Sequence, residues 1–200
     1  APGRRMGGRA GGGGWATGAE VRAAAAARGA ELSVAAAGPG FRAAARVQGR
    51  EVGWVSGFVL PPPVGILHLD KVVVDLGGLS GGGAGDGGRL QRLRGMHGLG
   101  LLLGAAAVCH GAEAGCRRAE LLAINDGPPT YRRLVRHYER LGFIAVREVG
   151  ENGLSDLPHL LVWGGEGMRM DAEIGDLLEK WSPYLKAQAL LGAEEAGDPQ

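Results

Sequence analysis

The stretch "RGMHGLGLLLGAAAVC", residues 94–109, decides how the rest of the chain is interpreted. Its first eleven positions contain four glycines, and from Leu99 onward it carries no charge. The composition predicts a buried helix from Leu99 to Ala114 that ends at Gly115, because glycine is favoured just beyond helix ends. The stretch is therefore expected to be a glycine-rich turn directly before a helix.

A helix that begins in this way can bind an anion. Its N-terminus leaves backbone N–H groups unpaired and carries a partial positive charge, so it attracts groups such as phosphates. Glycines in front of the helix let an anion approach the main chain, and Gly95, Gly98 and Gly100 stand where this is needed. Arg94 adds a guanidinium that can pair with phosphate oxygens. We expect a phosphate-binding turn, with a purely structural turn as the alternative.

The neighbouring segments predict a mixed α/β fold. Residues 41–48 and 51–60 are expected to form a hairpin joined at "QGR", and residues 65–74 a central strand. Further along we expect a strand at 117–124, an amphipathic helix at 130–142, strands at 143–149 and 159–165, and a helix at 172–185. Because helices between strands imply parallel neighbours, the prediction is one central mixed sheet of about six or seven strands with flanking helices.

Length and composition predict a single domain. The 200 residues suffice for one sizeable core. We expect a flexible Gly-, Ala- and Arg-rich segment at 1–30, one folded domain at 31–187 and a disordered tail at 188–200. The alanine-rich residues 20–37 can also form a short helix and a strand. Residues 76–88 have the composition of a flexible loop.

Charge and cysteine content argue against several kinds of partner. With 22 basic and 21 acidic residues the formal net charge is +1, and no apolar run approaches the roughly 18 residues that a membrane span needs. Cys109 and Cys116 lack the paired spacing of a zinc site, and His110 is better explained as a surface imidazole. We therefore expect no metal, no nucleic acid and no membrane as partners.

Three kinds of ligand site use a glycine turn before a helix. A P-loop requires Gly-Lys-Ser/Thr, which the chain lacks at this place. A dinucleotide fold requires an apolar strand leading into the glycines, whereas "RLQRLR" precedes them here. Glu120, twenty residues beyond Gly100, keeps a nicotinamide-dependent oxidoreductase open as an alternative.

The order of several segments resembles the GNAT superfamily of acyl-CoA N-acyltransferases. The segments are "LDKVVVD", the glycine turn with its apolar helix, "AELLAI" and "RHYERLGF", and the resemblance covers residues 41–165. Its most specific parts are "GLG" at 98–100 and "YERLGF" at 138–143. The resemblance implies a GNAT-type fold and an N-acetyltransferase that uses acetyl-CoA as co-substrate.

The two ends of the chain bear on its location. The C-terminal "LLVWGGEGMRMDAEIGDLLEKW" resembles the ending of plastid GNAT-type proteins of plants and algae. The first 19 residues contain three arginines and no acid, which is typical of organelle-targeting segments and also of a disordered tail with biased composition. We expect a chloroplast protein, with the cytoplasm as the alternative.

The resemblance also assigns residues to the cofactor. The pantetheine arm pairs with backbone N–H and C=O groups of the central strand, a role that falls on Val72 and Val74. The pyrophosphate falls to Arg94, Gly95, His97, Gly98, Leu99 and Gly100. Two departures from the family pattern stand out: Arg94 lies one place too early, and the gap from Val74 to Gly98 is longer than usual. Such long loops are tolerated, because closure entropy grows only logarithmically with length.

The implied reaction is attack of a neutral amine on the thioester of acetyl-CoA, which needs a base and an acid. Tyr138 stands where the family places the acid, and a phenol with a pKa near ~10 stays protonated at neutral pH; a core aromatic is the alternative. For the base we favour Asp70 on the central strand, with Glu120 and His68 as rivals. Asn125 is assigned to the cofactor, because Tyr131 occupies the usual asparagine position.

The acceptor is expected to be an amine, either on a protein, at its N-terminus or a lysine, or in a small molecule. Because the arginine, the asparagine and the loop all depart from the family pattern, the alternative is an inactive GNAT domain that serves as a binding or scaffold module. The chain is expected to be a monomer or a homodimer.

Overall fold

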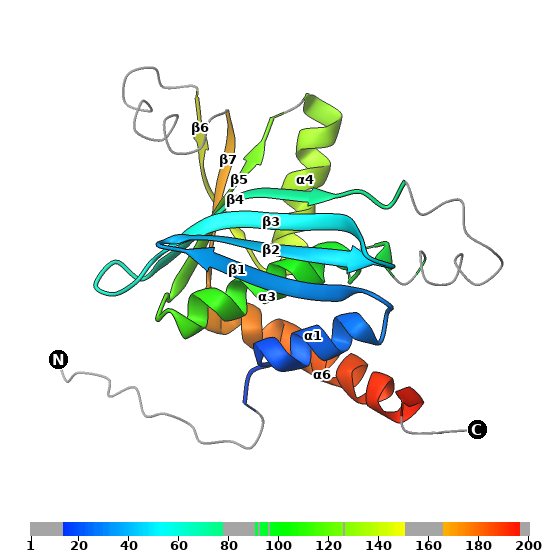
Figure 1. The fold of residues 1–200 in the computed structure, drawn as a ribbon. Coiled ribbons are helices and arrows are strands. Elements are labelled where there is room, and N and C mark those ends of the chain that lie inside the picture. Colours follow the sequence, from blue (N-terminus) through cyan, green and yellow to red (C-terminus); the bar gives the residue numbers. More distant parts are fainter. Residues whose placement is uncertain are drawn as a thin grey trace.

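The computed structural model describes residues 14–77, 91, 93–95, 97–125, 127–150 and 166–196. One seven-stranded sheet runs through this part of the chain in the order β1-β2-β3-β4-β5-β7-β6 (Figure 1). The strands are β1 (Glu31–Ala37), β2 (Gly40–Val47), β3 (Arg50–Leu60), β4 (Ile66–Val74), β5 (Arg118–Ile124), β6 (Ile144–Val149) and β7 (Gly167–Glu173). The predicted fold class, a mixed α/β fold with a sheet of this size, is confirmed.

The sheet is antiparallel at both flanks and parallel at one central step. β1 to β4 pair antiparallel in sequence order, β4 pairs parallel with β5, and β7 lies antiparallel between β5 and β6. The predicted hairpin and the predicted central strand are confirmed. The hairpin is tight because Gln48 and Gly49 both adopt positive φ angles, 52° and 77°, which match the twist of the strands.

The helices of the described residues are α1 (Gly18–Ala26), α3 (Leu99–Glu113), α4 (Pro128–Leu141) and α6 (Ile174–Ala196). In Figure 1, α1, α3 and α6 lie together below the sheet, and α3 packs against the strands from β1 to β4. α3 is apolar around most of its circumference and is buried along most of its length, as its composition predicts. It forms the crossover that makes β4 and β5 parallel.

α4 has the amphipathic character that its sequence predicts. Leu141 is buried and Tyr138 packs against the core. The opposite face carries exposed arginines: Arg132, Arg133, Arg136 and Arg140. The helix ends where Gly142 adopts the left-handed conformation, with φ at 117°, and Gly142 N–H donates to the carbonyls of Tyr138 and Glu139.

Both ends of the predicted domain need correction. Within the segment expected to be flexible, residues 18–26 form a helix, because Thr17 and Glu20 make a capping box and Val21 is buried in the core. At the other end, α6 continues to Ala196 instead of giving way to a tail at 188. Residues 1–13 and 197–200 lie outside the described residues.

The last strand was not predicted. β7 occupies residues 167–173, where Met168, Met170 and Ala172 alternate with Arg169 and Asp171, and it fills the space between β5 and β6. The strand predicted at 159–165 and nearly all of the predicted loop at 76–88 lie outside the described residues.

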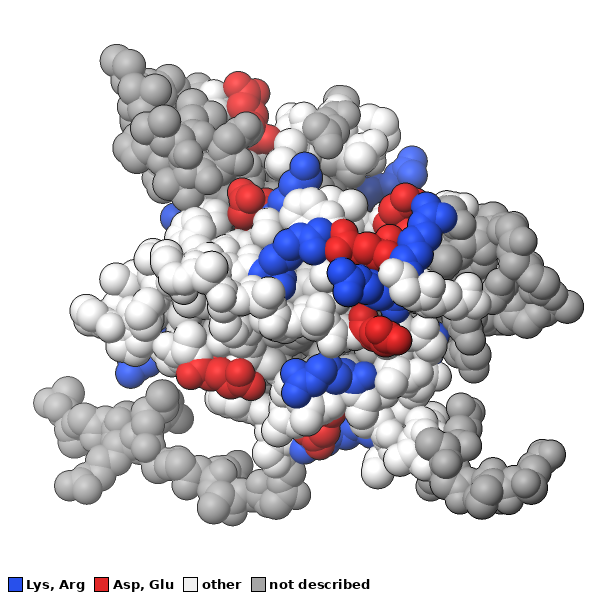
Figure 2. All heavy atoms as spheres, in the orientation of Figure 1, with Lys and Arg blue, Asp and Glu red and all other residues white. Residues whose placement is uncertain are grey.

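The visible surface carries charges of both signs. Figure 2 shows basic and acidic side chains interspersed over one face of the molecule. Arg42 and Glu51, on neighbouring strands, form such a pair, with Nη2 and Oε1 2.7 Å apart. None of the described helices is both long and apolar enough to span a membrane.

Candidate functional site

The two central strands separate partway along their length. β4 and β5 pair from Ile66 opposite Arg118 to Leu69 opposite Leu121, and their mutual pairing ends there although both strands continue. Asp70 forms a bulge at this point, since Leu69 lies opposite Gly57 while Lys71 lies opposite Ser56. A bulge bends a strand away from its neighbour. The sheet therefore opens between β4 and β5.

Backbone groups of β4 face this opening. Asp75 N–H donates to the Val52 carbonyl on β3 at 2.9 Å, so the odd-numbered residues at this end of β4 direct their hydrogen-bonding groups toward β3. Because these groups alternate along an antiparallel strand, the N–H and C=O of Val72 and Val74 point toward β5. The strand beyond the bulge thus offers an edge to which an extended molecule can pair.

A cavity of about 60 Å³ lies beside the opening. Its lining is mostly apolar and comes from β3, β4, α3, β5, α4 and α6, with Leu69 and Leu121 from the point of divergence and Trp181 from α6. Three of the predicted site residues line it together: Val72, Gly100 and Tyr138. Segments far apart in the sequence therefore meet at one place.

Tyr138 presents a protonated phenol to this cavity. Burial raises the pKa of the phenol above its ordinary value, and the ring packs edge-on against Phe143 with centroids 6.0 Å apart. His137 beside it was not predicted as a site residue, yet it lines the same cavity. Burial and then the charge of Arg140 lower its pKa, so its imidazole is neutral at pH 7. Within the part of the chain that the structure describes, the cavity thus has a proton donor, Tyr138, beside a neutral base, His137.

The glycine turn has the predicted position at the start of α3. Gly98 is the N-cap, and no side chain among the described residues caps the helix. A Cβ on Gly98 would collide with the carbonyl oxygens of Leu93 and Arg94, and Gly95 has φ at +83°, so the turn itself requires both glycines. The unpaired N–H groups of the first turn are therefore available to an anion.

Two further glycines of α3, Gly100 and Gly104, are not required by the packing of the described residues. Among the atoms of the described residues, a Cβ on Gly100 or on Gly104 would meet none within 4 Å, and both residues line the cavity. Glycine inside a helix costs about 1 kcal/mol relative to alanine. At Gly111, by contrast, a Cβ would press on Leu67 at 3.0 Å. The space beside Gly100 and Gly104 is thus left open at a cost in stability, as expected where a ligand approaches the backbone.

The remaining turn residues contribute in different ways. Arg94 is exposed, and Leu99 is fully buried, so Leu99 can act only through its backbone. His97 is exposed and its ring lies 4.7 Å from that of Tyr184 on α6. The His97 carbonyl oxygen accepts hydrogen bonds from Arg28 and Tyr184.

The residues considered for the base lie apart from the cavity. Asp70 is exposed at the bulge and does not line the cavity in the part of the chain that the structure describes. His68 is fully buried against Phe58, and its Nδ1 lies 3.1 Å from Oε1 of Glu120. The two rivals for the base are therefore joined to each other.

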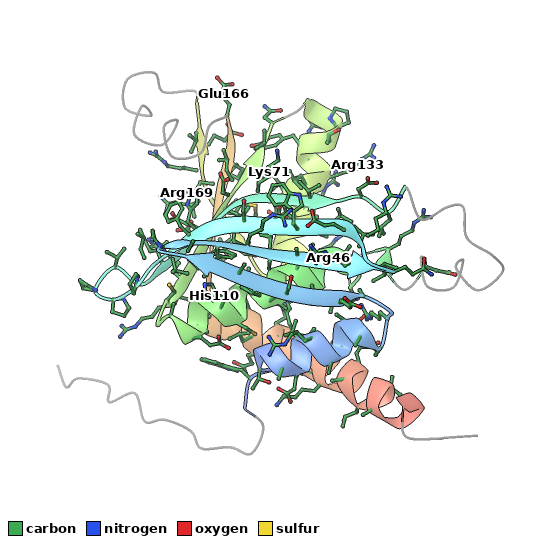
Figure 3. The ribbon with its side chains drawn as sticks, viewed as in Figure 1. Arg46, Lys71, His110, Arg133, Glu166 and Arg169 are labelled. Carbon is green, nitrogen blue, oxygen red and sulfur yellow. The ribbon has the colours of Figure 1, made fainter. Side chains whose placement is uncertain are left out.

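Glu120 belongs to a charge cluster on the sheet face opposite α3. Arg169 donates to Glu120 Oε2 at 2.9 Å and to Asp171, and it is labelled in Figure 3. Burial raises the pKa of Glu120, but the hydrogen bond from His68 and the charges of Arg169, His68 and Arg118 outweigh it, so the pKa is lowered overall. Glu120 is thus an ionised carboxylate that stabilises the fold through His68 and Arg169 and is poorly suited to accept a proton.

Asn125 is placed elsewhere. Its Oδ1 accepts from Gly127 N–H at 3.2 Å, just before α4, and it lines a separate cavity of about 40 Å³ with Tyr131 and Glu148. The Tyr131 hydroxyl donates to Glu148 at 3.0 Å. The structure therefore does not bring Asn125 to the cavity beside Tyr138.

The cysteines show no sign of chemistry. Both thiols are free and buried. Burial and then the charge of Glu113 raise the pKa of the Cys109 thiol to about 11, so it stays protonated. Among the described residues no three His, Cys, Asp or Glu side chains are grouped to hold a metal ion.

Comparison with known proteins gives similarities of fold. No family model matches the chain, and no curated protein is a match by sequence. Among solved structures, a protein of the GNAT acetyltransferase family from Desulfovibrio desulfuricans is 18% identical with a TM-score of 0.46, covering 68% of this chain and 69% of that one. A mutant spermidine/spermine N-acetyltransferase from Vibrio cholerae is 13% identical with a TM-score of 0.47 and 71% of each chain covered. An aminoglycoside 6'-N-acetyltransferase from Enterococcus faecium is 15% identical with a TM-score of 0.43, covering 68% and 75%.

Proposed function

We propose that this protein is a GNAT-type N-acetyltransferase that transfers the acetyl group of acetyl-CoA to an amine. The observation that carries the proposal is the opening between β4 and β5, with a cavity beside it that Gly100, Gly104 and Tyr138 line together. An extended thioester with a charged end fits such a site, because one strand edge, one helix N-terminus and one acid are arranged around it.

The chain offers separate groups to each part of acetyl-CoA. The N–H and C=O of Val72 and Val74 face the opening and can pair with the amides of the pantetheine arm. The first turn of α3 and the exposed Arg94 can bind the diphosphate. The open space beside Gly100 and Gly104 can hold the part of acetyl-CoA that lies between the pantetheine amides and the diphosphate. The residues present therefore fit the co-substrate.

The reaction needs a proton acceptor and a proton donor. An amine that attacks the thioester carbonyl carbon forms a C–N bond, and the C–S bond breaks. Tyr138 gives its proton to the departing sulfur and regains one from solvent. Asp70 lies at the edge of the opening and takes the proton of the amine through water, since its side chain does not line the cavity. The backbone N–H of Val72 can stabilise the negative charge that develops on the carbonyl oxygen.

Titration calorimetry with acetyl-CoA tests the proposal. The informative variant is Gly104→Leu, because its side chain would enter the open space of the cavity without displacing any atom near the Cβ. We expect the native chain to bind and the variant to lose at least about tenfold in affinity. Gly111→Ala, which strains the same helix against Leu67, is the matched control and should bind like the native chain.

The outcomes separate the possible functions. Equal binding by the native chain and Gly104→Leu would show that the cavity is not the site. Binding without turnover on a panel of amines and peptides would favour a scaffold module, to which the positions of Asp70 and Asn125 outside the cavity also point. Absence of binding by the native chain would refute the acetyltransferase proposal.

A further inference from the structure

Arg28 is a buried arginine that contacts the glycine turn from the interior of the protein. It lies between α1 and β1, only 3% of its surface is exposed, and its Nη1 donates to the carbonyl oxygen of His97. Its Nη2 donates to the hydroxyl of Tyr184 on α6, and its Nε lies 3.4 Å from Oε1 of Gln188. The guanidinium thus joins α1, α6 and the residue that directly precedes the N-cap of α3.

Tyr184 strengthens this connection. Its hydroxyl donates to the same His97 carbonyl at 3.2 Å, so one backbone oxygen accepts from both Arg28 and Tyr184. The Tyr184 ring lies 5.0 Å from the guanidinium carbon of Arg28 and 4.7 Å from the ring of His97. Two hydrogen bonds to its carbonyl oxygen and one ring contact therefore fix the position of His97.

The location of this contact matters for electrostatics. The first turn of α3 presents unpaired N–H groups and a partial positive charge, and no side chain of the described residues caps it. Arg28 places a full positive charge just behind this end of the helix, away from water. A charge in such a position is screened little and raises the potential that an incoming anion meets.

We propose that Arg28 is a positioning residue for the diphosphate end of the co-substrate. It fixes the His97 carbonyl, keeps the turn in the shape that exposes the α3 N-terminus, and adds a buried positive charge there. This inference rests on the proposed function, because it assigns Arg28 to the same site. Arg28 itself, buried behind the turn, acts through His97.

The experiment compares ligands with and without phosphate. Arg28→Met keeps an unbranched side chain about as long as the aliphatic part of arginine and removes the charge and the donors. We expect acetyl-CoA affinity to fall about tenfold, whereas the affinity for S-acetylpantetheine, which has no phosphate, stays unchanged when followed by NMR titration. Gln188→Met, which removes only the long contact to Nε, is the control and should leave both affinities unchanged.

A milder variant covers the case in which Arg28→Met does not fold. Tyr184→Phe keeps the ring against Arg28 and removes one donor to His97. We expect about a threefold loss in acetyl-CoA affinity and faster hydrogen exchange of the turn amides in the free protein.

Each result decides between the two proposals. Equal losses for acetyl-CoA and S-acetylpantetheine would show a general structural role for Arg28 and overturn the inference, and so would unchanged affinity in both variants. In either case the native chain binds acetyl-CoA and the proposed function survives. If the native chain binds neither ligand, the proposed function fails and the inference fails with it.

Discussion

Gly104 and Gly111 lie two turns apart on α3 and have opposite surroundings: a Cβ on Gly104 would enter open space, whereas a Cβ on Gly111 would lie 3.0 Å from Leu67. One glycine is required by helix–sheet packing. The other leaves room on the cavity side, so two substitutions of the same type should have effects of opposite sign.

Gly104→Ala should raise the free energy of unfolding by about 0.5–1 kcal/mol, because alanine is the better helix former and the added methyl group meets nothing. Gly111→Ala should lower it by about 1 kcal/mol or more, since packing strain outweighs helix propensity. Urea unfolding of both variants measures the difference. A stability loss in Gly104→Ala would contradict the open space seen beside that residue.

Gly98→Ala should destabilise the protein by about 2 kcal/mol or more, because the methyl group would collide with the carbonyl oxygens of Leu93 and Arg94. Gly100→Ala, two residues later, is the matched control and should be at least as stable as the native chain. Thermal unfolding gives the comparison. Similar melting temperatures for the two variants would show that the turn can relax around a side chain.

Glu120→Gln should reduce stability at neutral pH and change its pH dependence. The pKa of Glu120 is below its ordinary value in the folded chain, so the ionised group contributes stability that is fully present above about pH 4.5 and is lost as the pH falls through the folded pKa. The difference between the native chain and the variant should therefore shrink below that pH. Chemical unfolding at pH 7, 5 and 3 measures it, and a difference that grows in acid would refute the assigned ion pairs.

Tyr138→Phe should lower kcat for acetyl transfer by about 10²-fold and leave the KM for acetyl-CoA nearly unchanged, because the phenol acts on the leaving sulfur and not in binding. Since burial raises the pKa of Tyr138, any loss of activity from its ionisation should come at a higher pH than for an ordinary tyrosine. Steady-state kinetics over pH 6–10 test both statements. An unchanged kcat would reduce Tyr138 to a core aromatic.

Asp70→Asn should lower kcat by about 10²-fold at pH 7, because it removes the proposed proton acceptor. His137→Gln is the comparison, because His137 lines the cavity with a lowered pKa and is the other available base. A loss of kcat in His137→Gln but not in Asp70→Asn, measured by steady-state kinetics at pH 7, would transfer the role of proton acceptor to His137.

The sequence predicts most of the fold because the decisive elements have strong local signals. Examples are the β-branched end of β4, the apolar α3 and the amphipathic α4 that ends at Gly142. β7 was missed because "GMRMDAE" contains no β-branched residue, and its alternation has meaning only between β5 and β6. For residues 18–26 the sequence left both a helix and a flexible segment open, because an alanine-rich composition is compatible with either.

The site was less predictable because it depends on tertiary contacts. Val72, Gly100 and Tyr138, which the resemblance to the GNAT superfamily implies as site residues, do meet at the cavity. Asn125 depends on a loop geometry that spacing does not determine. Arg28 is 69 positions from His97 and 156 from Tyr184, so no local pattern reveals its contacts.

The bulge at Asp70 shifts the phase of β4 by one residue. On β3, the cavity face contains Val55 and Gly57, two residues apart, but their partners on β4 are Val72 and Leu69, three apart. Before the bulge the odd-numbered side chains of β4 face the cavity side, and after it the even-numbered ones do. Deleting Asp70 would place Leu69 and Val72 two residues apart, like their partners Gly57 and Val55, so both would keep the cavity face. The bulge itself, and the bend that carries β4 away from β5, would be lost. The extra residue at position 70, more than the identity of its side chain, therefore opens the sheet beside the cavity.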